Sequence, residues 1–243
     1  MANPSGPSNA SVPLLDARRI SRTYKMGEGG VPAVQDVSLI IGEAEFVALQ
    51  GPSGSGKTTL LNILGLLDRP DGGSLSIAGL AAEDLSENDR ADLRRDRFGF
   101  VFQTFNLIPV LSAQENVAYP MALAGMPAGE RRSRAEELLS AVGLEEKSSV
   151  RPDLLSGGQR QRIAIARSLA NRPAVVFADE PTANLDSKTA EDILDLMRGL
   201  CDSHRVAFLF ATHDPRVVAR ARRVVSLHDG RIESDIVSGG GPS

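Results

Sequence analysis

The sequence predicts an α/β protein with a mostly parallel sheet, an antiparallel β layer at its start and a helical insertion in its middle. In the second half, short apolar runs alternate with segments of helical periodicity, which is typical of a parallel sheet. The opening is instead rich in short apolar runs, at residues 14–20, 37–41 and 46–50, with glycine-rich residues 26–30 as a hairpin or loop. Residues 104–153 are helical in pattern and interrupt the two β/α halves.

Each further element follows from a local signal. Ser86 and Asp89 have the spacing of a capping box, which predicts a helix start. Gly143 suits the residue after a helix end, and Asp71-Gly72-Gly73 is typical of a turn. We expect helices at 58–66, 86–97, 115–124, 130–142, 159–170, 187–200 and 215–221, and further strands at 74–78, 174–178, 206–211 and 224–227.

Composition limits the classes of function. The 243 residues are 42% hydrophobic, enough for a full core, and carry a formal net charge of −4. An acidic balance argues against broad nucleic-acid binding, so no nucleic-acid partner is expected. The single cysteine, Cys201, excludes an internal disulfide. No run approaches the ~20 apolar residues of a membrane span.

The two ends of the chain are polar and rich in Gly, Pro and Ser. We expect disordered tails at residues 1–12 and 238–243, with no signal peptide, around one domain at residues 13–237. Within that domain, a helical subdomain is expected at about residues 104–155.

A glycine-rich segment fits the P-loop pattern G-x-x-x-x-G-K-[ST] without mismatch. It follows an expected strand and opens an expected helix, so its backbone N–H groups can curl around phosphate oxygens. Lys57 can reach the β- and γ-phosphates, and the Thr58 hydroxyl can bind Mg²⁺. The predicted ATP contacts here are Gly51, Ser53, Gly54, Ser55, Gly56, Lys57, Thr58 and Thr59.

Two carboxylates end the apolar run at residues 174–178. The carboxyl end of a parallel strand faces the crevice where ligands bind. Asp179 is placed to hold Mg²⁺, and Glu180 to orient and deprotonate an attacking water. Ser156-Gly157-Gly158-Gln159 opens a second phosphate-binding helix, which invites a second chain to complete each site.

At these residues the chain resembles the ATP-binding-cassette (ABC) ATPases over residues 14–236. The motifs occur in the family's order: the P-loop, Gln103, the Leu155-Ser-Gly-Gly-Gln159 signature, Asp179 with Glu180, Asp186 and His213. The complete signature makes the resemblance specific. It implies a P-loop ATPase fold with a helical subdomain that carries the signature.

The resemblance also implies roles. Tyr24 would stack on adenine, and Gln103 would touch Mg²⁺ and the attacking water and relay nucleotide state to a partner. Ser156 to Gln159 would contact the γ-phosphate held by the opposite subunit, and Asp186 would lie at the dimer seam. His213 would contact the γ-phosphate and support Glu180.

Taken alone, several of these residues have plainer interpretations. Tyr24 fits a surface ring, and His213 a capping residue. Arg160, Arg162 and Arg167 are expected on a solvated helix face, as are Arg94, Arg95 and Arg97.

Residues 98–109 and 115–117, with the insertion after Tyr24, are similar to the macrolide-export, lipoprotein-release and cell-division group (MacB-, LolD- and FtsE-like ATPases). One departure is Ala183, where that group more often has glycine. The resemblance implies an ATP- and Mg²⁺-dependent homodimer at the cytoplasmic membrane face that drives an integral-membrane permease on a separate chain.

Three alternatives stay open at this point. The first is an ABC ATPase that signals through a membrane partner, as the cell-division members do. The second is a soluble ABC protein of DNA repair or translation, although the coiled-coil insertion or second cassette usual there is missing. The third is a nucleotide-binding module without turnover, against which Glu180 and His213 argue. The transported substrate is not encoded in these motifs.

Overall fold

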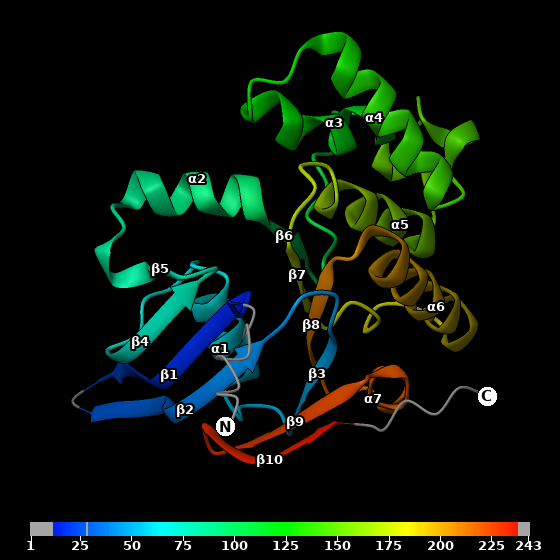
Figure 1. The fold of residues 1–243 in the computed structure, drawn as a ribbon. Coiled ribbons are helices and arrows are strands. Elements are labelled where there is room, and N and C mark those ends of the chain that lie inside the picture. Colours follow the sequence, from blue (N-terminus) through cyan, green and yellow to red (C-terminus); the bar gives the residue numbers. More distant parts are fainter. Residues whose placement is uncertain (1–11, 28, 238–243) are drawn as a thin grey trace, which may run out of the picture.

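The computed structural model describes residues 12–27 and 29–237 (Figure 1). The predicted tails at residues 1–12 and 238–243 therefore lie outside the described residues, except for Val12. The proposed domain bounds stay predictions.

A six-stranded sheet forms the centre of the molecule, in the order β10-β9-β3-β8-β7-β6. Its neighbouring strands are parallel except at the β9–β10 pair, which is antiparallel. The strands are β3 (Phe46–Gln50), β6 (Phe98–Val101), β7 (Val175–Asp179), β8 (Ala207–Thr212), β9 (Arg223–His228) and β10 (Arg231–Val237).

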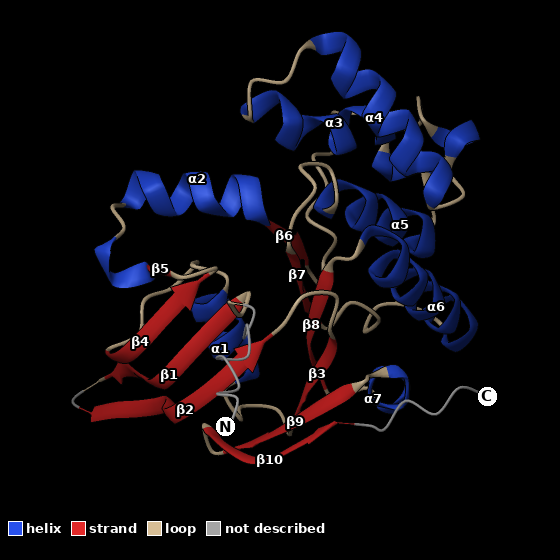
Figure 2. Cartoon of the chain, viewed as in Figure 1, coloured by secondary structure: helices blue, strands red, loops and turns tan. Residues whose placement is uncertain are grey.

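A second, antiparallel sheet has the order β2-β1-β4-β5. It lies beside the central sheet, with helix α1 (Lys57–Leu64) between the two (Figures 1 and 2). Its strands are β1 (Leu15–Met26), β2 (Gly29–Ile41), β4 (Gly72–Ile77) and β5 (Leu80–Ala81).

Helices α3 to α7 cover the other side of the central sheet or project from it, whereas α2 packs on the side of α1 through Leu93. Helices α3, α4 and α5 pack together as a helical arm, and α6 lies beside α5 (Figure 2). Their bounds are α2 (Glu87–Arg97), α3 (Ala113–Leu123), α4 (Ala128–Ala141), α5 (Gly157–Ser168), α6 (Ser187–His204) and α7 (Pro215–Arg220), with single 3₁₀ turns at Ala82–Asp84, Glu145–Lys147 and Pro152–Leu154.

The central strands are buried on both faces, which explains their unbroken apolar runs. In β3, Val47 and Leu49 pack with α1 and the antiparallel sheet, whereas Phe46 and Ala48 pack against the helical side. Because successive side chains of β3 point to opposite faces of the sheet, this strand contributes to the hydrophobic clusters on both faces.

The predicted fold class is confirmed, including the antiparallel layer and the helices in the middle of the chain. The capping box of Ser86 and Asp89 is present, and Gly143 has the positive φ of 70° expected after a helix end. Three strands were not predicted: β5, β6 and β10. The turn expected at 71–73 is partly wrong, because Gly72 and Gly73 already belong to β4.

A buried carboxylate ties the ends of β7 and β8 together. Thr182, just after β7, donates its hydroxyl to Asp214 Oδ2 at 2.8 Å, and Arg216 forms an ion pair with the same carboxylate at 2.7 Å. Burial raises the pKa of Asp214, but hydrogen bonds from Arg216 and Thr182 and the Arg216 charge outweigh it and lower the pKa to about 2. The segments that carry Glu180 and His213 are thereby joined.

Asp214→Asn should destabilise the protein by about 2 kcal/mol at pH 7, because each pKa unit is worth about 1.4 kcal/mol. The folded-state pKa lies below the ordinary 3.8, so this stability is complete above about pH 4 and is lost as pH falls toward 2. Urea unfolding of both proteins from pH 7 to pH 2.5 measures the difference. An equal difference at all pH values would contradict the assignment, and Asp153→Asn, an exposed acid, is the control.

A pair of glycines tests the packing of β6. A Cβ on buried Gly99 would lie 2.3 Å from the Ser168 carbonyl oxygen, whereas nothing lies within 4 Å of a Cβ on Gly199 in α6. Gly99→Ala should therefore cost about 1–3 kcal/mol. Gly199→Ala should add about 0.5–1 kcal/mol, since alanine favours the helix. Urea unfolding at pH 7 checks both, and equal effects of the two substitutions would refute the packing argument.

Candidate active site

The predicted nucleotide site is a cavity of about 620 Å³ at the carboxyl ends of the central strands. Its walls come from the loop after β3, the loop after β6, and the ends of β7 and β8. The structure brings together ten of the predicted site residues there: Tyr24, Ser53, Gly54, Gly56, Lys57, Thr58, Thr59, Gln103, Glu180 and His213. Ala33, Pro52 and Ala183 also line it and were not predicted.

The P-loop backbone is fixed by close packing. Gly56 caps α1 with a φ of 97°, and a Cβ there would lie 2.1 Å from the Ala33 carbonyl oxygen of β2. A Cβ on Gly51 would lie 2.2 Å from the Leu227 carbonyl oxygen of β9. Gly51 and buried Ser55 stand behind the loop and do not line the cavity. Glycine is thus required at Gly51 and Gly56 because any larger residue would collide with neighbouring backbone, whether or not a phosphate is bound.

The Lys57 side chain lies within the P-loop. Its Nζ donates to the carbonyl oxygens of Gly51 at 2.8 Å and Pro52 at 2.9 Å, and the residue is buried. These are neutral acceptors, so a doubly or triply charged phosphate placed in the loop would be the stronger partner for the ammonium.

Thr58 and Asp179 form a pair of hard oxygen donors at the edge of the cavity. The Thr58 hydroxyl donates to Asp179 Oδ1 at 3.1 Å. Burial raises the pKa of Asp179, the Thr58 hydrogen bond and the Lys57 charge oppose this rise, and the Glu180 charge adds to it. A buried carboxylate whose charged form is disfavoured gains from a divalent cation, so the donor set fits Mg²⁺.

Three donors hold the Glu180 carboxylate, one from the last residue of strand β8 and two from the residue that follows it. His213 Nδ1 lies 2.6 Å from Glu180 Oε1, and the His213 backbone N–H donates to the same oxygen at 3.2 Å. The buried Thr212 hydroxyl donates to Oε2 at 3.2 Å. Since an ionised carboxylate only accepts, the short contact places a proton on Nδ1 and leaves Nε2 on the far side of the ring. Thr212 was missed, although it directly precedes His213.

Backbone strain supports the placement of Glu180. It has a φ of 44°, which residues other than glycine rarely adopt, and its N–H donates to the Ala211 carbonyl oxygen at 2.9 Å. Such strain concentrates at functional sites, where neighbouring contacts keep it.

Tyr24 lies at the cavity mouth, 38% exposed. Its hydroxyl donates to Asp68 Oδ2 at 2.7 Å, and the Arg22 guanidinium carbon lies 5.0 Å from the ring centroid. The ring is therefore fixed in orientation, with Arg22 on one face.

The signature residues lie outside this cavity. Ser156 caps α5 and, with Gln159, forms a capping box, while Asp186 caps α6 through the Thr189 backbone N–H. A Cβ on Gly158 would lie 2.5 Å from Thr189 Cγ2, so the start of α5 packs against the start of α6. Ser156 and Asp186 are exposed. Within one chain, the two predicted phosphate-binding helix starts do not meet.

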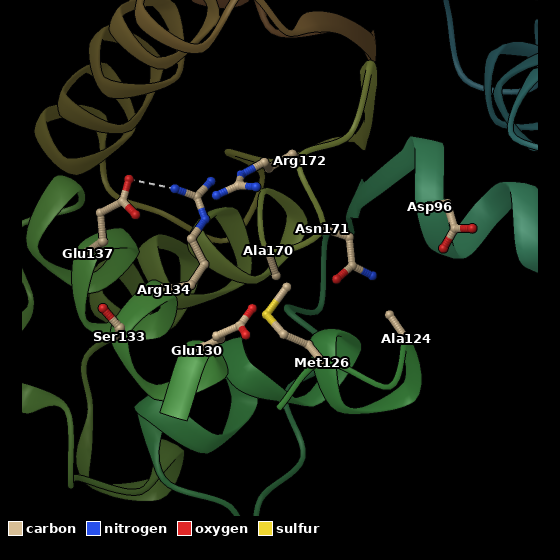
Figure 3. Close-up of a pocket in the computed structure, with 10 residues that line it drawn as sticks. All are labelled: Asp96, Ala124, Met126, Glu130, Ser133, Arg134, Glu137, Ala170, Asn171 and Arg172. Atoms are coloured by element: carbon tan, nitrogen blue, oxygen red, sulfur yellow. Dashed lines mark hydrogen bonds and ion pairs between the residues drawn. The ribbon is translucent and has the colours of Figure 1, made fainter. Parts of the chain in front are cut away.

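A different cavity, of about 480 Å³, lies between α4, the end of α2 and the turn after α5 (Figure 3). Arg134 and Glu137 of α4 form an ion pair in its wall, near Arg172. None of the predicted site residues lines it.

The expectation of a solvated helix face is wrong for three of the six arginines, whereas Arg97 is exposed and Arg95 pairs with Asp92 and Asp96 on its own helix. Arg167 donates to the carbonyl oxygens of Phe105 and Asn106, and Arg162 donates to that of Val142. Arg94 donates to the carbonyl oxygen of Leu66. Each of these guanidinium groups caps a turn or helix end of another segment, which a one-dimensional charge pattern does not reveal.

Comparisons with known proteins agree with this geometry. The family described as ABC transporter matches residues 34–183. The uncharacterized ABC transporter ATP-binding protein MJ0796 of Methanocaldococcus jannaschii is 45% identical over 226 residues, which cover 91% of this chain and 96% of that protein. A solved dimeric structure of the MJ0796 cassette in a post-hydrolysis state, bound to ADP and Pi, matches with a TM-score of 0.85 and 44% identity, over 93% of this chain and 100% of that one.

Longer proteins match equally well. The macrolide export ATP-binding/permease protein MacB of Syntrophobacter fumaroxidans is 48% identical over 91% of this chain and 31% of its own length. The pyoverdine export ATP-binding/permease protein PvdT of Pseudomonas aeruginosa is 49% identical over 92% of this chain and 34% of its own length. The chain spans about a third of these relatives.

Among the described residues, no helix has the length and apolar character needed to cross a bilayer. The family match, the near full-length similarity to an ATP-binding cassette and the shared fold agree. The chain therefore belongs to the ABC transporter family and is one of its ATP-hydrolysing cassettes.

Proposed function

We propose that two copies of this chain hydrolyse ATP in a shared pair of sites and thereby energise a membrane permease carried on a separate chain. One observation carries the proposal. A single chain gathers the P-loop, Glu180 and His213 around one cavity, with Asp179 bonded to Thr58 at its edge, yet leaves Ser156 at the start of α5 exposed and outside it.

The nucleotide occupies the 620 Å³ cavity. Tyr24 stacks on adenine with the ring face that Arg22 leaves open. The backbone N–H groups at the start of α1 and the Lys57 ammonium bind the β- and γ-phosphates. Thr58, Asp179 and Gln103 hold Mg²⁺, which would neutralise charge on the phosphate oxygens.

Glu180 acts as the general base. Its carboxylate is fixed by His213 and Thr212, so it can accept the proton of a water that attacks the γ-phosphate. The His213 Nε2 edge, turned away from Glu180, is the part of the ring available to the γ-phosphate. Glu180 would thus orient the attacking water, and His213 Nε2 would contact the γ-phosphate.

The second copy supplies Ser156, Gly157, Gly158 and Gln159. The start of α5 has unpaired backbone N–H groups and the positive end of a helix dipole, which favours an anion. Placed over the γ-phosphate of the opposite copy, it completes the site, with Asp186 at the seam. The MJ0796 cassette, solved as a dimer bound to ADP and Pi, supports the pairing of two copies.

The permease docks in an apolar groove of about 370 Å³ between α2, β6, α3 and the end of α5. Leu67, Tyr119 and Leu123 are exposed in its lining, and Phe102 directly precedes Gln103. Exposed apolar side chains grouped in a groove are typical of a site for an amphipathic helix. A cytoplasmic helix of the permease seated there would sense the loop that carries Gln103.

The names of the relatives support export as the work performed. MacB and PvdT are named as export ATP-binding/permease proteins, and this chain matches about a third of their length. We place the protein peripherally at the cytoplasmic face of the membrane, where ATP and the permease loops meet.

Glu180→Gln tests the base. Glutamine keeps the size of the side chain but cannot accept the proton, so hydrolysis should fall by about 10²–10⁴. ATP should still bind and close the dimer, so the variant should accumulate at about twice 25.8 kDa. Light scattering behind size exclusion, with ATP–Mg²⁺ against ADP–Mg²⁺, measures this, and Glu146→Gln is a surface control. Wild-type turnover in Glu180→Gln would remove Glu180 from the role.

Gly157→Asp, added to Glu180→Gln, tests the two-chain site. A Cβ on Gly157 has its nearest neighbour, Leu185 Cδ2, at 3.5 Å, so the fold should accept the change. Aspartate repels the γ-phosphate of the other copy but touches no part of the cavity in its own chain. The double variant should bind fluorescent ATP as tightly as Glu180→Gln yet stay at 25.8 kDa. A monomer that has lost ATP binding would show that the signature serves its own chain.

A further inference from the structure

The loop between β6 and α3 contains two consecutive residues in a backbone conformation that they disfavour. Phe105 has a φ of 62° and Asn106 a φ of 51°. Asparagine adopts this left-handed region more readily than most residues, but a bulky aromatic residue seldom does. Two short turns form there, from the Phe105 N–H to the Phe102 carbonyl oxygen at 3.2 Å and from the Asn106 N–H to that of Thr104 at 2.7 Å.

Arg167 on α5 holds both strained residues. Its Nη1 donates to the Asn106 carbonyl oxygen at 2.5 Å and its Nη2 to that of Phe105 at 2.8 Å. No other acceptor for this guanidinium lies among the described residues. Burial lowers the pKa of Arg167, as expected for a guanidinium withdrawn from water. Charge-assisted hydrogen bonds of this kind are strong enough to hold a strained turn.

A second arginine of the same helix reaches the same turn. The Arg160 guanidinium carbon lies 5.1 Å from the centroid of the Phe105 ring, within range of a cation–π contact. Arg160 and Arg167 are seven residues apart, or two turns, and so share one face of α5. Arg162, on another face, donates instead to the Val142 carbonyl oxygen at 2.9 Å.

The segments on both sides of the turn are also tethered. Asn184 Nδ2 donates to the Gln103 carbonyl oxygen at 2.9 Å, and buried Asn116 bonds the backbone of Ile108 through both its side-chain atoms. Gln103, which lines the nucleotide cavity, is therefore tethered at its own carbonyl oxygen by Asn184 and is followed by the turn that Arg167 holds.

We propose that Arg167, assisted by Arg160, is a positioning residue that keeps Phe105 and Asn106 in their left-handed turn and so fixes Gln103 in the nucleotide cavity. Because both arginines project from α5, whose first residues are the signature, any displacement of α5 on dimer closure is passed to Gln103. We call the contacts of Arg167 and Arg160 with Phe105 and Asn106 the clamp. The effect on catalysis rests on the role of Gln103 given under Proposed function, whereas the existence of the clamp does not depend on that role.

Arg167→Met in the full chain tests the clamp without reference to catalysis. Methionine keeps much of the apolar stem and removes both donors. Amide hydrogen exchange in a peptide covering residues 102–108 should quicken by about tenfold or more, since the turn loses its main hydrogen bonds. Exchange in the P-loop should not change. Arg162→Met is the matched control on the same helix and should leave exchange at 102–108 unaltered.

Steady-state hydrolysis then tests the positioning. Arg167→Met should lower kcat by about tenfold while the Kd for ATP stays within about twofold. Glycine adopts positive φ without penalty, so in an Asn106→Gly background the same substitution should lower kcat by less than about threefold. A role confined to stability would give no such rescue, and Arg162→Met should keep wild-type kcat.

The outcomes separate the clamp from the proposed function. Unchanged exchange at 102–108 in Arg167→Met overturns the clamp. Faster exchange with unchanged kcat overturns the positioning role, and so does an equal loss of kcat with and without Asn106→Gly. If the wild-type chain binds no ATP, the proposed function fails, and the exchange result still decides the clamp.

Discussion

The close approach of the P-loop to backbone on two sides is the constraint on which the site depends. A Cβ on Gly56 would lie 2.1 Å from the Ala33 carbonyl oxygen, and one on Gly230 would lie 2.9 Å from the same atom. The Gln35 N–H also donates to the Gly230 carbonyl oxygen at 2.7 Å. These contacts seat β2 of the antiparallel sheet against the P-loop. The sheet that carries Tyr24 is therefore positioned by the same glycines that shape the phosphate loop.

The parallel sheet brings Glu180 and His213 together, and contacts next to them keep them in place. Because β7 and β8 are adjacent, Glu180 and His213 meet at 2.6 Å although they are 33 residues apart. Thr182 and Asp214 join the segments that follow these strands, so Glu180 and His213 are braced by a contact just beyond them. Rigid strands and a buried ion-paired carboxylate are what allow one short contact to persist in an otherwise open cavity.

Much of the fold and the cavity was predictable because their signals are local. The P-loop pattern, the carboxylates that end an apolar strand and the serine caps all depend on neighbours in sequence. The strand β6 was missed because it is only Phe98–Val101 and its signal is shorter than the periodicity that reveals a strand. Thr212, Ala33 and Asp214 gain their roles from strand adjacency. Arg167 was misassigned because the carbonyl groups that it binds lie 61 and 62 residues away.

The arginines of α5 show how one helix can serve two sites. Its first residues would face a phosphate held by a second copy in the function proposed above, and its Arg167 bonds the loop that follows Gln103 inside the chain. A helix transmits a shift along its axis with little loss, because its hydrogen bonds make it stiff compared with a loop. If closure moves the start of α5, the strained turn at Phe105 and Asn106 must move with it or release its strain. Either response would change the position of Gln103, so the proposed clamp would couple the nucleotide state to the groove beside Phe102 through a contact that no single motif contains.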